Sequence, residues 1–262
     1  MRIGVGYRHE LSAWIDSRPS GVSCLEITAE HFFGGGEDRL RDLSARFALS
    51  VHGLSLSLGT PGPIDPGRLA GFCRVVAAAN PDWISEHVAF TRTAEVDLGH
   101  LNPLMPTRAV LDRVADHARE LSDRCGKPVL LENITSHVRL AGELSETDFL
   151  NALCERAGCG LLLDVTNLFV NSRNHGFDPL EWLGEIEPKR IVQLHIVGYS
   201  RVGRRLADGH STPIQAELVA LARAVVDRSP VEAVILERDE DFPGPAAMAV
   251  EIGKLEGLRG GR

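Results

Sequence analysis

In six consecutive apolar segments of the chain, a histidine or a carboxylate ends the part that can form a strand. Two later positions extend the set: Asn167 lies three residues after Asp164, and an Asp-Gly-His motif supplies Asp208 and His210. Imidazole and carboxylate groups are the usual protein ligands of Zn, Fe and Mn. The pattern therefore predicts a metal site assembled from many strand ends. The six segment-end residues are His52, His87, Glu132, Asp164, His195 and Glu237.

Each of these residues, taken singly, has an ordinary structural explanation. A strand-end histidine is often a hydrogen-bonded interior residue, and a strand-end carboxylate often caps the next helix. Together, however, so many charged groups at one place would repel one another or stay unpaired unless cations compensate them. Nine side chains also exceed the roughly four protein ligands of a single zinc ion. We therefore expect two or three ions, bridged by Glu132, Asp164 and Glu237.

Apolar runs alternate along the chain with segments of helical period. In the segment 106–126, Val110, Val114, Ala118 and Leu121 recur at a spacing of three or four residues, and Gly126 follows as a stop signal. The other runs and segments repeat this order. The expected strands are 3–8, 23–30, 49–56, 83–90, 128–134, 160–167, 190–197 and 232–238, and the expected helices are 11–17, 37–47, 66–79, 106–126, 145–157, 178–186, 213–228 and 244–256.

This alternation predicts an α/β fold, a (β/α)₈ TIM barrel that forms one domain over residues 1–262, with a frayed tail from about residue 257. An open doubly wound sheet is the alternative. Against it, Gly4 and Gly6 lie inside the first run, and no Gly-x-Gly-x-x-Gly follows a strand. In a barrel the carboxyl ends of all strands meet at one mouth, which would bring the segment-end residues together.

Composition narrows the possible partners and the compartment. The chain has 262 residues, 44% of them hydrophobic, and a net charge of −8, which disfavours binding to nucleic acids or anionic membranes. Its five cysteines lack a Cys-x-x-Cys spacing, which indicates free thiols in a reducing compartment. The first residues show no apolar signal segment, and no run approaches the length of a membrane span. We therefore expect a cytoplasmic protein without nucleic-acid or membrane partners.

The order of the ligand-type residues resembles two groups of metal-dependent barrels. At the ligand level only, it is similar to the endonuclease-four family of zinc phosphodiesterases, in the wider xylose isomerase-like group. Over nearly the whole chain, it resembles the multinuclear non-heme iron-dependent oxidative enzymes (MNIO), the group containing the methanobactin-synthesis oxidase. The matching stretches are GVGYR (4–8), EITAE (26–30), HGLSLSLG (52–59), SEHVAF (85–90), LLEN (130–133), LLLDVTNLFVNSRNHGFDP (161–179), QLHIVG (193–198), DGH (208–210) and LER (236–238).

The chain also departs from the MNIO pattern at three positions. Members commonly have asparagine where Thr166 and His31 stand, and an aromatic residue where Arg238 stands. None of these departures removes an expected ligand, although Arg238 could alter a substrate pocket.

The MNIO resemblance implies two or three iron ions, Fe(II) or Fe(III), with O₂ as co-substrate. It implies oxidation of a residue, often cysteine, in a ribosomally made precursor peptide of natural-product biosynthesis, usually with a separate protein that presents the peptide. Arg8 and Arg238, at the mouths of the first and last strands, are candidate anchors for a peptide carboxylate. The implied catalytic residues are His52, His87, Glu132, Asp164, His195 and Glu237, and the implied metal ligands are these six with Asn167, Asp208 and His210.

Two other functions remain as alternatives. One is a zinc phosphodiesterase or a sugar isomerase of the same barrel type, and the other is a non-catalytic metal-binding protein. The acidic net charge disfavours the DNA enzyme, and the full set of ligand types disfavours a non-catalytic scaffold. Because an asparagine amide donates more weakly than imidazole, we also expect the ion held by Asn167 to be the most exchangeable.

Overall fold

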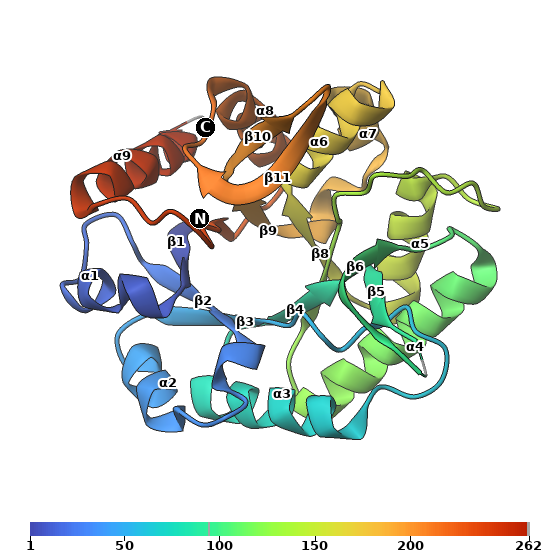
Figure 1. The fold of residues 1–262 in the computed structure, drawn as a ribbon, viewed down its shortest axis with the longest axis horizontal. Helices are drawn as coiled ribbons and strands as arrows, with labels where there is room; N and C mark the ends of the chain where they lie inside the picture. The colour runs from blue at the N-terminus through green and yellow to red at the C-terminus, as the bar shows by residue number, and fades with distance from the viewer. Residues whose placement is uncertain (94, 261–262) are drawn as a thin grey trace.

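Eight parallel strands close into a barrel in the computed structural model, which describes residues 1–93 and 95–260 (Figure 1). Around the barrel the strands follow the order β1-β12-β9-β8-β7-β4-β3-β2. The TIM barrel predicted from the sequence is thereby confirmed, and each of the eight expected runs overlaps one barrel strand. The strands are β1 (Arg2–Tyr7), β2 (Cys24–Thr28), β3 (Ala48–His52), β4 (Ile84–His87), β7 (Val129–Glu132), β8 (Gly160–Asp164), β9 (Ile191–Ile196) and β12 (Ala233–Leu236).

Amphipathic helices surround the barrel and cover its outer face. Helix α4 shows how the sequence sets their limits: the Thr107 side chain accepts a hydrogen bond from Val110 N, and Gly126 ends the helix at φ 64°. Its apolar stripe, which includes Val114 and Leu121, is buried. The helices are α1 (Ser12–Asp16), α2 (Glu37–Ser44), α3 (Pro66–Ala79), α4 (Arg108–Cys125), α5 (Glu146–Ala157), α6 (Val165–His175), α7 (Pro179–Glu185), α8 (Ala216–Arg228) and α9 (Pro245–Glu256).

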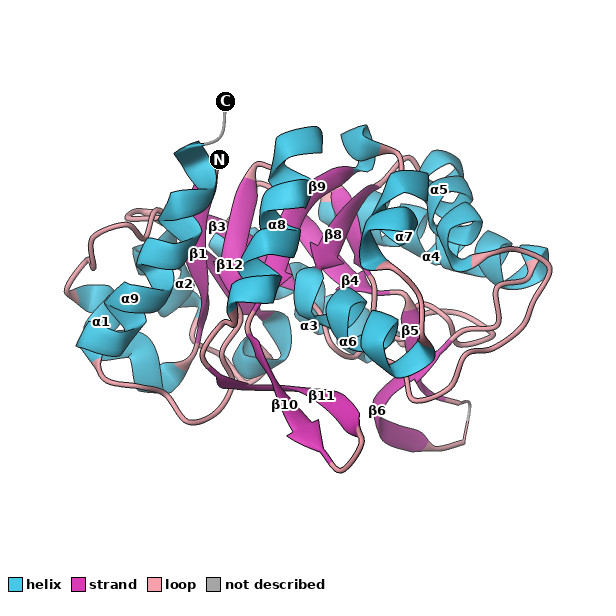
Figure 2. Cartoon of the chain, turned by 90° about the horizontal axis from the view of Figure 1, so that it is seen from above, coloured by secondary structure: helices cyan, strands magenta, loops and turns pink. Residues whose placement is uncertain are grey.

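Two antiparallel hairpins, which the sequence patterns did not predict, project from one end of the barrel (Figure 2). The first pairs β5 (Ala89–Arg92) with β6 (Asp97–Pro103), and the second pairs β10 (Gly198–Val202) with β11 (Arg205–Thr212). Each hairpin follows the carboxyl end of a barrel strand after a single residue. The apolar run 83–90 therefore includes the first residues of a hairpin strand. The run 190–197 ends directly before another hairpin strand.

The structure corrects the expected strand 160–167. Strand β8 stops at Asp164, whose carboxylate accepts a hydrogen bond from Asn167 N at 2.7 Å and so caps α6. The apolar residues after Asp164 belong to this helix, which was absent from the sequence expectation. The expected helix 178–186 is the separate helix α7, which begins at Pro179 after the capping residue Asp178.

The end of the chain also differs from the expected frayed tail. Gly257–Gly260 form a 3-10 turn in which Leu258 is buried, and Arg223 donates a hydrogen bond to the Leu258 carbonyl at 2.6 Å. The last two residues of the expected tail, 261 and 262, lie outside the described residues. Among the described helices, none has the length and apolar character needed to cross a membrane.

Side chains inside the barrel change from apolar to polar along the strands. A small cluster fills the amino-terminal part and includes Trp83, Leu130, Leu162 and Ile235. Because side chains in a strand alternate between two faces, Glu132 and Asp164 follow Leu130 and Leu162 on the same inner face. The barrel thus supports a layer of ionisable groups at the carboxyl ends of its strands from an apolar floor.

Candidate metal centre

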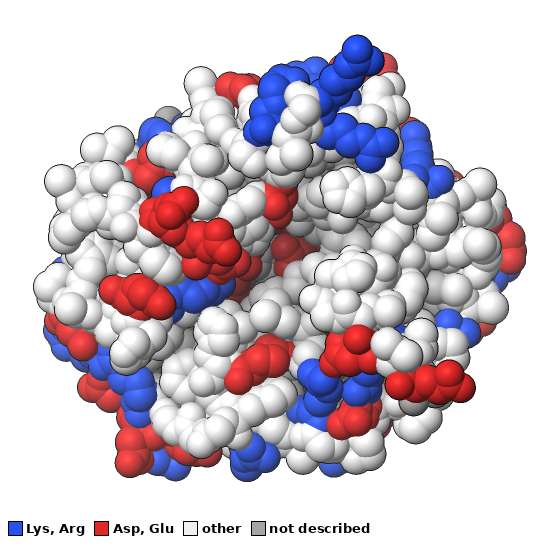
Figure 3. Space-filling model, viewed as in Figure 1, with Lys and Arg blue, Asp and Glu red and all other residues white. Residues whose placement is uncertain are grey.

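The six segment-end residues converge at the mouth of the barrel, where each is buried. His52, His87, Glu132 and Asp164 are the last residues of their strands, His195 lies one residue before the end of β9, and Glu237 directly follows β12. A space-filling view toward this end shows a hollow with acidic atoms on its floor and rim (Figure 3). The predicted convergence is present in the structure.

Ligand-type atoms of these side chains form overlapping groups of a size that suits metal ions. Within each group, one nitrogen or oxygen atom of every residue lies within 4.8 Å of the others. Glu132 belongs to two groups, and Asp164 links one of these to the Asp-Gly-His motif. The groups are His52, His87 and Glu132; Glu132, Asp164, His195 and Glu237; Asp164, Asp208 and His210; and His210, Glu237 and Asp239.

The carboxylate of Glu132 contacts three histidines through both of its oxygens. Its Oε2 lies 3.3 Å from His52 Nε2 and 3.4 Å from His87 Nε2, whereas its Oε1 lies 3.2 Å from His195 Nδ1. A carboxylate whose two oxygens face different sets of donors has the geometry of a bridging ligand. The bridging role expected of Glu132 from the sequence remains a prediction.

The hairpin β10–β11 brings the last two ligand-type residues back to the barrel mouth. His210 Nε2 lies 2.6 Å from Asp208 Oδ2, and His210 Nδ1 lies 3.7 Å from Glu237 Oε2. His210 has a left-handed backbone with φ 48°, which is uncommon for a residue with a side chain. Such conformations cluster at functional sites, and His210 Nδ1 lies toward Glu237 at the barrel mouth.

Charge crowding shifts the protonation of these groups strongly. Burial, together with the charges of Asp208 and Glu132, raises the pKa of Asp164 well above its usual value. Burial alone would lower the pKa of His195, but Glu237 and other carboxylates raise it well above the usual value. Carboxylates likewise raise the pKa of His87 to about 9 and that of His210 to about 12. The negative charge of the mouth thus favours cations.

Several buried atoms at the mouth are suited to hold an ion. Among the described residues, His52 Nε2, Glu132 Oε2, Asp164 Oδ2, Asp208 Oδ1 and His210 Nδ1 make no hydrogen bond. His52 Nε2 and Glu132 Oε2 are nevertheless 3.3 Å apart, and His210 Nδ1 is 3.0 Å from Asp239 Oδ2. A buried polar atom without a partner costs about 1–3 kcal/mol, so five in one place need a compensating group. Imidazole nitrogens and carboxylate oxygens are suitable donors for Fe, Zn or Mn. The residues present therefore fit the metals expected from the sequence.

Residues that the sequence analysis missed hold the histidines in place. His52 Nδ1 lies 2.8 Å from Ser85 Oγ, and His87 Nδ1 lies 3.2 Å from Glu86 Oε1. These contacts leave the Nε2 atoms of both rings directed toward Glu132. A hydrogen-bonded partner on the outer nitrogen is the usual support of a metal-ligating histidine.

Glu26 supports His195 in the same way, although it stands in an apolar strand. Its Oε1 lies 2.6 Å from His195 Nε2, and its Oε2 accepts hydrogen bonds from Ser50 and Gln193. Gln193 in turn accepts a 2.6 Å hydrogen bond from the Trp83 indole. The signal available in the sequence was a carboxylate inside the run SCLEITAE, on the inward-facing positions of the strand.

Asn167 lies near the mouth, but its amide already has partners. The residue is in the first turn of α6; its Oδ1 accepts a hydrogen bond from Thr135, and its Nδ2 donates to the Asn133 carbonyl at 3.1 Å. Binding an ion through Oδ1 would replace the bond from Thr135. Its role as a metal ligand remains a prediction.

The two arginines expected to anchor a substrate are buried and already paired. Arg8 Nε donates to Asp239 Oδ1 at 2.7 Å, and the Arg238 guanidinium donates to the carbonyls of Ser211, Glu240 and Asp241. Of the nitrogen atoms of these two guanidinium groups, Arg238 Nη1 is buried without a hydrogen-bond partner. Anchoring a peptide carboxylate therefore remains a prediction for both arginines. Asp239, which lies 3.0 Å from His210 Nδ1, is a further candidate ligand that the sequence analysis missed.

Comparisons with solved structures agree with the fold. A D-psicose 3-epimerase from Clostridium cellulolyticum superposes with a TM-score of 0.65 at 13% identity, over 99% of this chain and 98% of that chain. A Thermus thermophilus protein whose crystals were soaked with ZnCl₂ has a TM-score of 0.60 at 20% identity, over 100% of both chains. At such low identity these similarities concern the barrel alone.

Sequence comparisons identify the family. A UPF0276 protein from Chromobacterium violaceum is 36% identical over 98% of this chain and 95% of its own length, and one from Caulobacter vibrioides is 32% identical over 92% and 88%. The model of the RiPP precursor modification enzymes MbnB/TglH/ChrH, which act on ribosomally made peptides, matches residues 2–259. This chain, with its barrel mouth lined by histidines and carboxylates, belongs to the MbnB/TglH/ChrH family of RiPP precursor modification enzymes.

Proposed function

We propose that this protein is an iron-dependent oxidase that uses O₂ to modify a residue, often a cysteine, of a precursor peptide. Membership of the peptide-modifying family supports the substrate class. The observation that carries the metal assignment is the linked arrangement of the groups, in which Glu132 and Asp164 are each shared. Two or three ions bridged by carboxylates would use all of the expected ligands.

Under this proposal the ligands are His52, His87, Glu132, Asp164, His195, Asp208, His210 and Glu237, with Asn167 as a weaker one. Iron would supply the one-electron and O₂ chemistry that side chains lack. The protein's own contribution is positional. Ser85, Glu86 and Glu26 fix the imidazoles, and the apolar part of the barrel interior would limit the access of water to the site from that side.

The peptide would enter from the hollow end of the barrel, where the two hairpins project (Figures 2 and 3). A separate protein that presents the peptide is part of the proposal, on the basis of the family resemblance. We also propose that the protein acts in the cytoplasm, because its five cysteines are free thiols and a reducing compartment preserves these.

Metal analysis of protein purified without oxygen tests the proposal. We expect at least two iron ions per chain, with Mössbauer signals of coupled iron, and peptide oxidation only when both O₂ and reduced iron are supplied. Zinc-loaded protein should be inactive as an oxidase because Zn²⁺ has no redox chemistry. A single metal per chain, or cleavage of abasic DNA by the zinc form, would instead favour the zinc-enzyme alternative.

A further inference from the structure

A cavity of about 440 Å³ lies beside the metal centre, on the outer side of the ends of β4 and β7. Its lining includes Val88, the residue after His87, and Asn133, the residue after Glu132. Val88 N donates to the Glu132 carbonyl at 2.9 Å, so these strand ends form one continuous wall. Because neighbouring residues of a strand face opposite sides, the metal centre and the cavity lie on the two sides of this wall.

Asn133 ties the cavity wall to a second ligand-type residue. Its side chain donates to the Asp164 carbonyl at 3.0 Å and accepts a hydrogen bond from Asp164 N at 2.8 Å. The same residue therefore lines the cavity and holds the end of β8. Asn133 thus places one wall of the cavity against the strand ends that carry Glu132 and Asp164.

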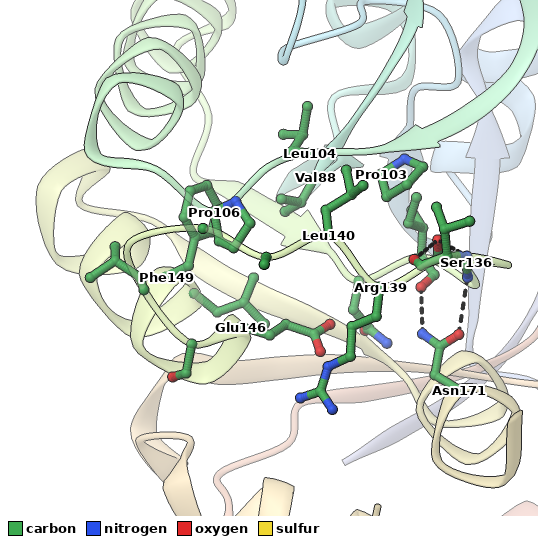
Figure 4. Close-up of a pocket in the computed structure, with 18 of the residues that line it drawn as sticks. Val88, Pro103, Leu104, Pro106, Ser136, Arg139, Leu140, Glu146, Phe149 and Asn171 are labelled. Atoms are coloured by element: carbon green, nitrogen blue, oxygen red, sulfur yellow. Dashed lines mark hydrogen bonds between the residues drawn. The ribbon is translucent and has the colours of Figure 1, made fainter. Parts of the chain in front are cut away.

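Apolar side chains dominate one side of the cavity, and charged ones stand on the other (Figure 4). Val88, Leu104 and Leu140 lie together, whereas Arg139 and Glu146 lie across from them. Glu146 accepts a hydrogen bond from the Trp182 indole at 3.3 Å, and burial raises the pKa of its carboxyl group. An uncharged, apolar occupant suits this lining, because burying a further charge here would be costly.

The loop between β7 and α5, residues 133–145, lines the cavity and is fixed by hydrogen bonds to α6. Asn171 accepts a hydrogen bond from Ser136 N at 3.0 Å and donates to the Ile134 carbonyl at 2.8 Å, while His175 Nε2 lies 2.8 Å from the Ser136 carbonyl. These bonds satisfy the polar groups of the loop and preform the cavity. Beyond them, Leu140 lines the cavity and is still 37% exposed, so an occupant could cover it.

We propose that this cavity binds an apolar side chain of the peptide substrate, of leucine or phenylalanine size, at the position directly before or after the modified residue. The proposal rests on the peptide-modifying function proposed above and adds a determinant of sequence preference. An extended peptide advances about 3.3 Å per residue and alternates its side chains. It can therefore place one side chain at the metal centre and a neighbour across the wall.

Binding of labelled peptides to the iron-loaded protein without oxygen tests this proposal. The probes are fluorescein-labelled hexapeptides with a central cysteine, which carry leucine, phenylalanine, lysine or aspartate directly before or after it. In one of the two positions, the leucine or phenylalanine peptide should bind at least about tenfold more tightly than the aspartate peptide, as burial of a large apolar side chain predicts. Equal binding of all probes, or no measurable binding, would overturn the proposal.

Matched variants distinguish binding in the cavity from non-specific hydrophobic binding elsewhere on the protein. Leu140→Asp should abolish the apolar preference, and Leu140→Met should retain it. Leu180→Asp replaces a leucine that is 54% exposed on α7, outside the cavity lining, and should leave the preference unchanged. A preference that survives Leu140→Asp would refute the assignment. Iron content and O₂-dependent oxidation, measured separately, report on the proposed function and do not depend on this preference.

Discussion

The two ends of the candidate metal centre are built differently. The group of His52, His87 and Glu132 consists of three buried strand ends of the barrel, whereas in the group of Asp164, Asp208 and His210 two members are partly exposed. Asp208 and His210 come from β11, which forms a two-stranded sheet with β10. Closed parallel sheets are rigid, while local openings favour exposed elements with few buried contacts. The comparison indicates a fixed inner end and a more adaptable outer end.

Removing the shared carboxylate should have the largest effect, because Glu132 belongs to both inner groups. We expect Glu132→Ala to lose the ions of both groups and to abolish oxidation, with an affinity loss beyond the roughly 100-fold that outer-shell changes cause. Elemental analysis and calorimetric titration with Fe(II) measure this. Glu181→Ala, at an exposed position of α7, is the control, and unchanged iron content in Glu132→Ala would remove Glu132 from the centre.

Breaking the outer end should cost less metal than breaking the inner one. Asp208→Ala and His210→Ala should each lose roughly one ion while the inner groups keep theirs, because these groups contain other donors. Metal analysis of the purified variants tests this. Arg201→Ala, an exposed change on the paired strand β10, should retain full metal content. If both hairpin variants lost all metal, the two ends would not be independent.

Asn167, whose backbone N–H donates to Asp164 Oδ1, is a further probe beside this outer group. We expect Asn167→Ala to lower the occupancy of one site and the activity without unfolding the barrel, and Asn167→His to shift preference from iron toward zinc. Competitive loading with equal Fe(II) and Zn(II), together with circular dichroism, measures both effects. If stoichiometry and turnover stay unchanged in both variants, the amide serves only its bonds to Thr135 and Asn133.

The smallest effect should come from the support of His195. Glu26→Gln keeps the size of the side chain but removes the charge beside His195 Nε2. We expect an affinity loss of about tenfold at the inner end, typical of an outer-shell change. Ser50→Ala, which removes a neighbour of Glu26 that donates to its Oε2, should change affinity less. Equal losses in the two variants would indicate a general disturbance of the barrel interior.

The regular parts of the fold could be predicted from the sequence because their signals are local. Each barrel strand lies within or at the edge of an apolar run, and α4 has its stripe, its cap and its terminal glycine within a few turns. The start of α6 could not be predicted in this way, since Leu161 to Val165 reads as one apolar strand. Only the capping bond from Asn167 N to Asp164 marks the change.

The candidate ligands could also be predicted from local signals. The residues that hydrogen-bond to the candidate histidine ligands could not. His52, His87 and Glu132 lie within apolar runs, where an ionisable residue stands out. Glu26 gave only a weak signal, because its partner His195 is far away in sequence and meets it only across the closed barrel.

The sequence by itself determined the alternation of strands and helices, the residue types at the strand ends and the resemblance to the peptide-modifying family. The tertiary structure decided which of these residues share an ion-sized space, how the hairpin returns Asp208 and His210 to the mouth, and where the apolar cavity lies. The physical reason is one of range. Periodicity and capping act over a few residues, whereas barrel closure fixes distances between side chains that the chain order leaves open.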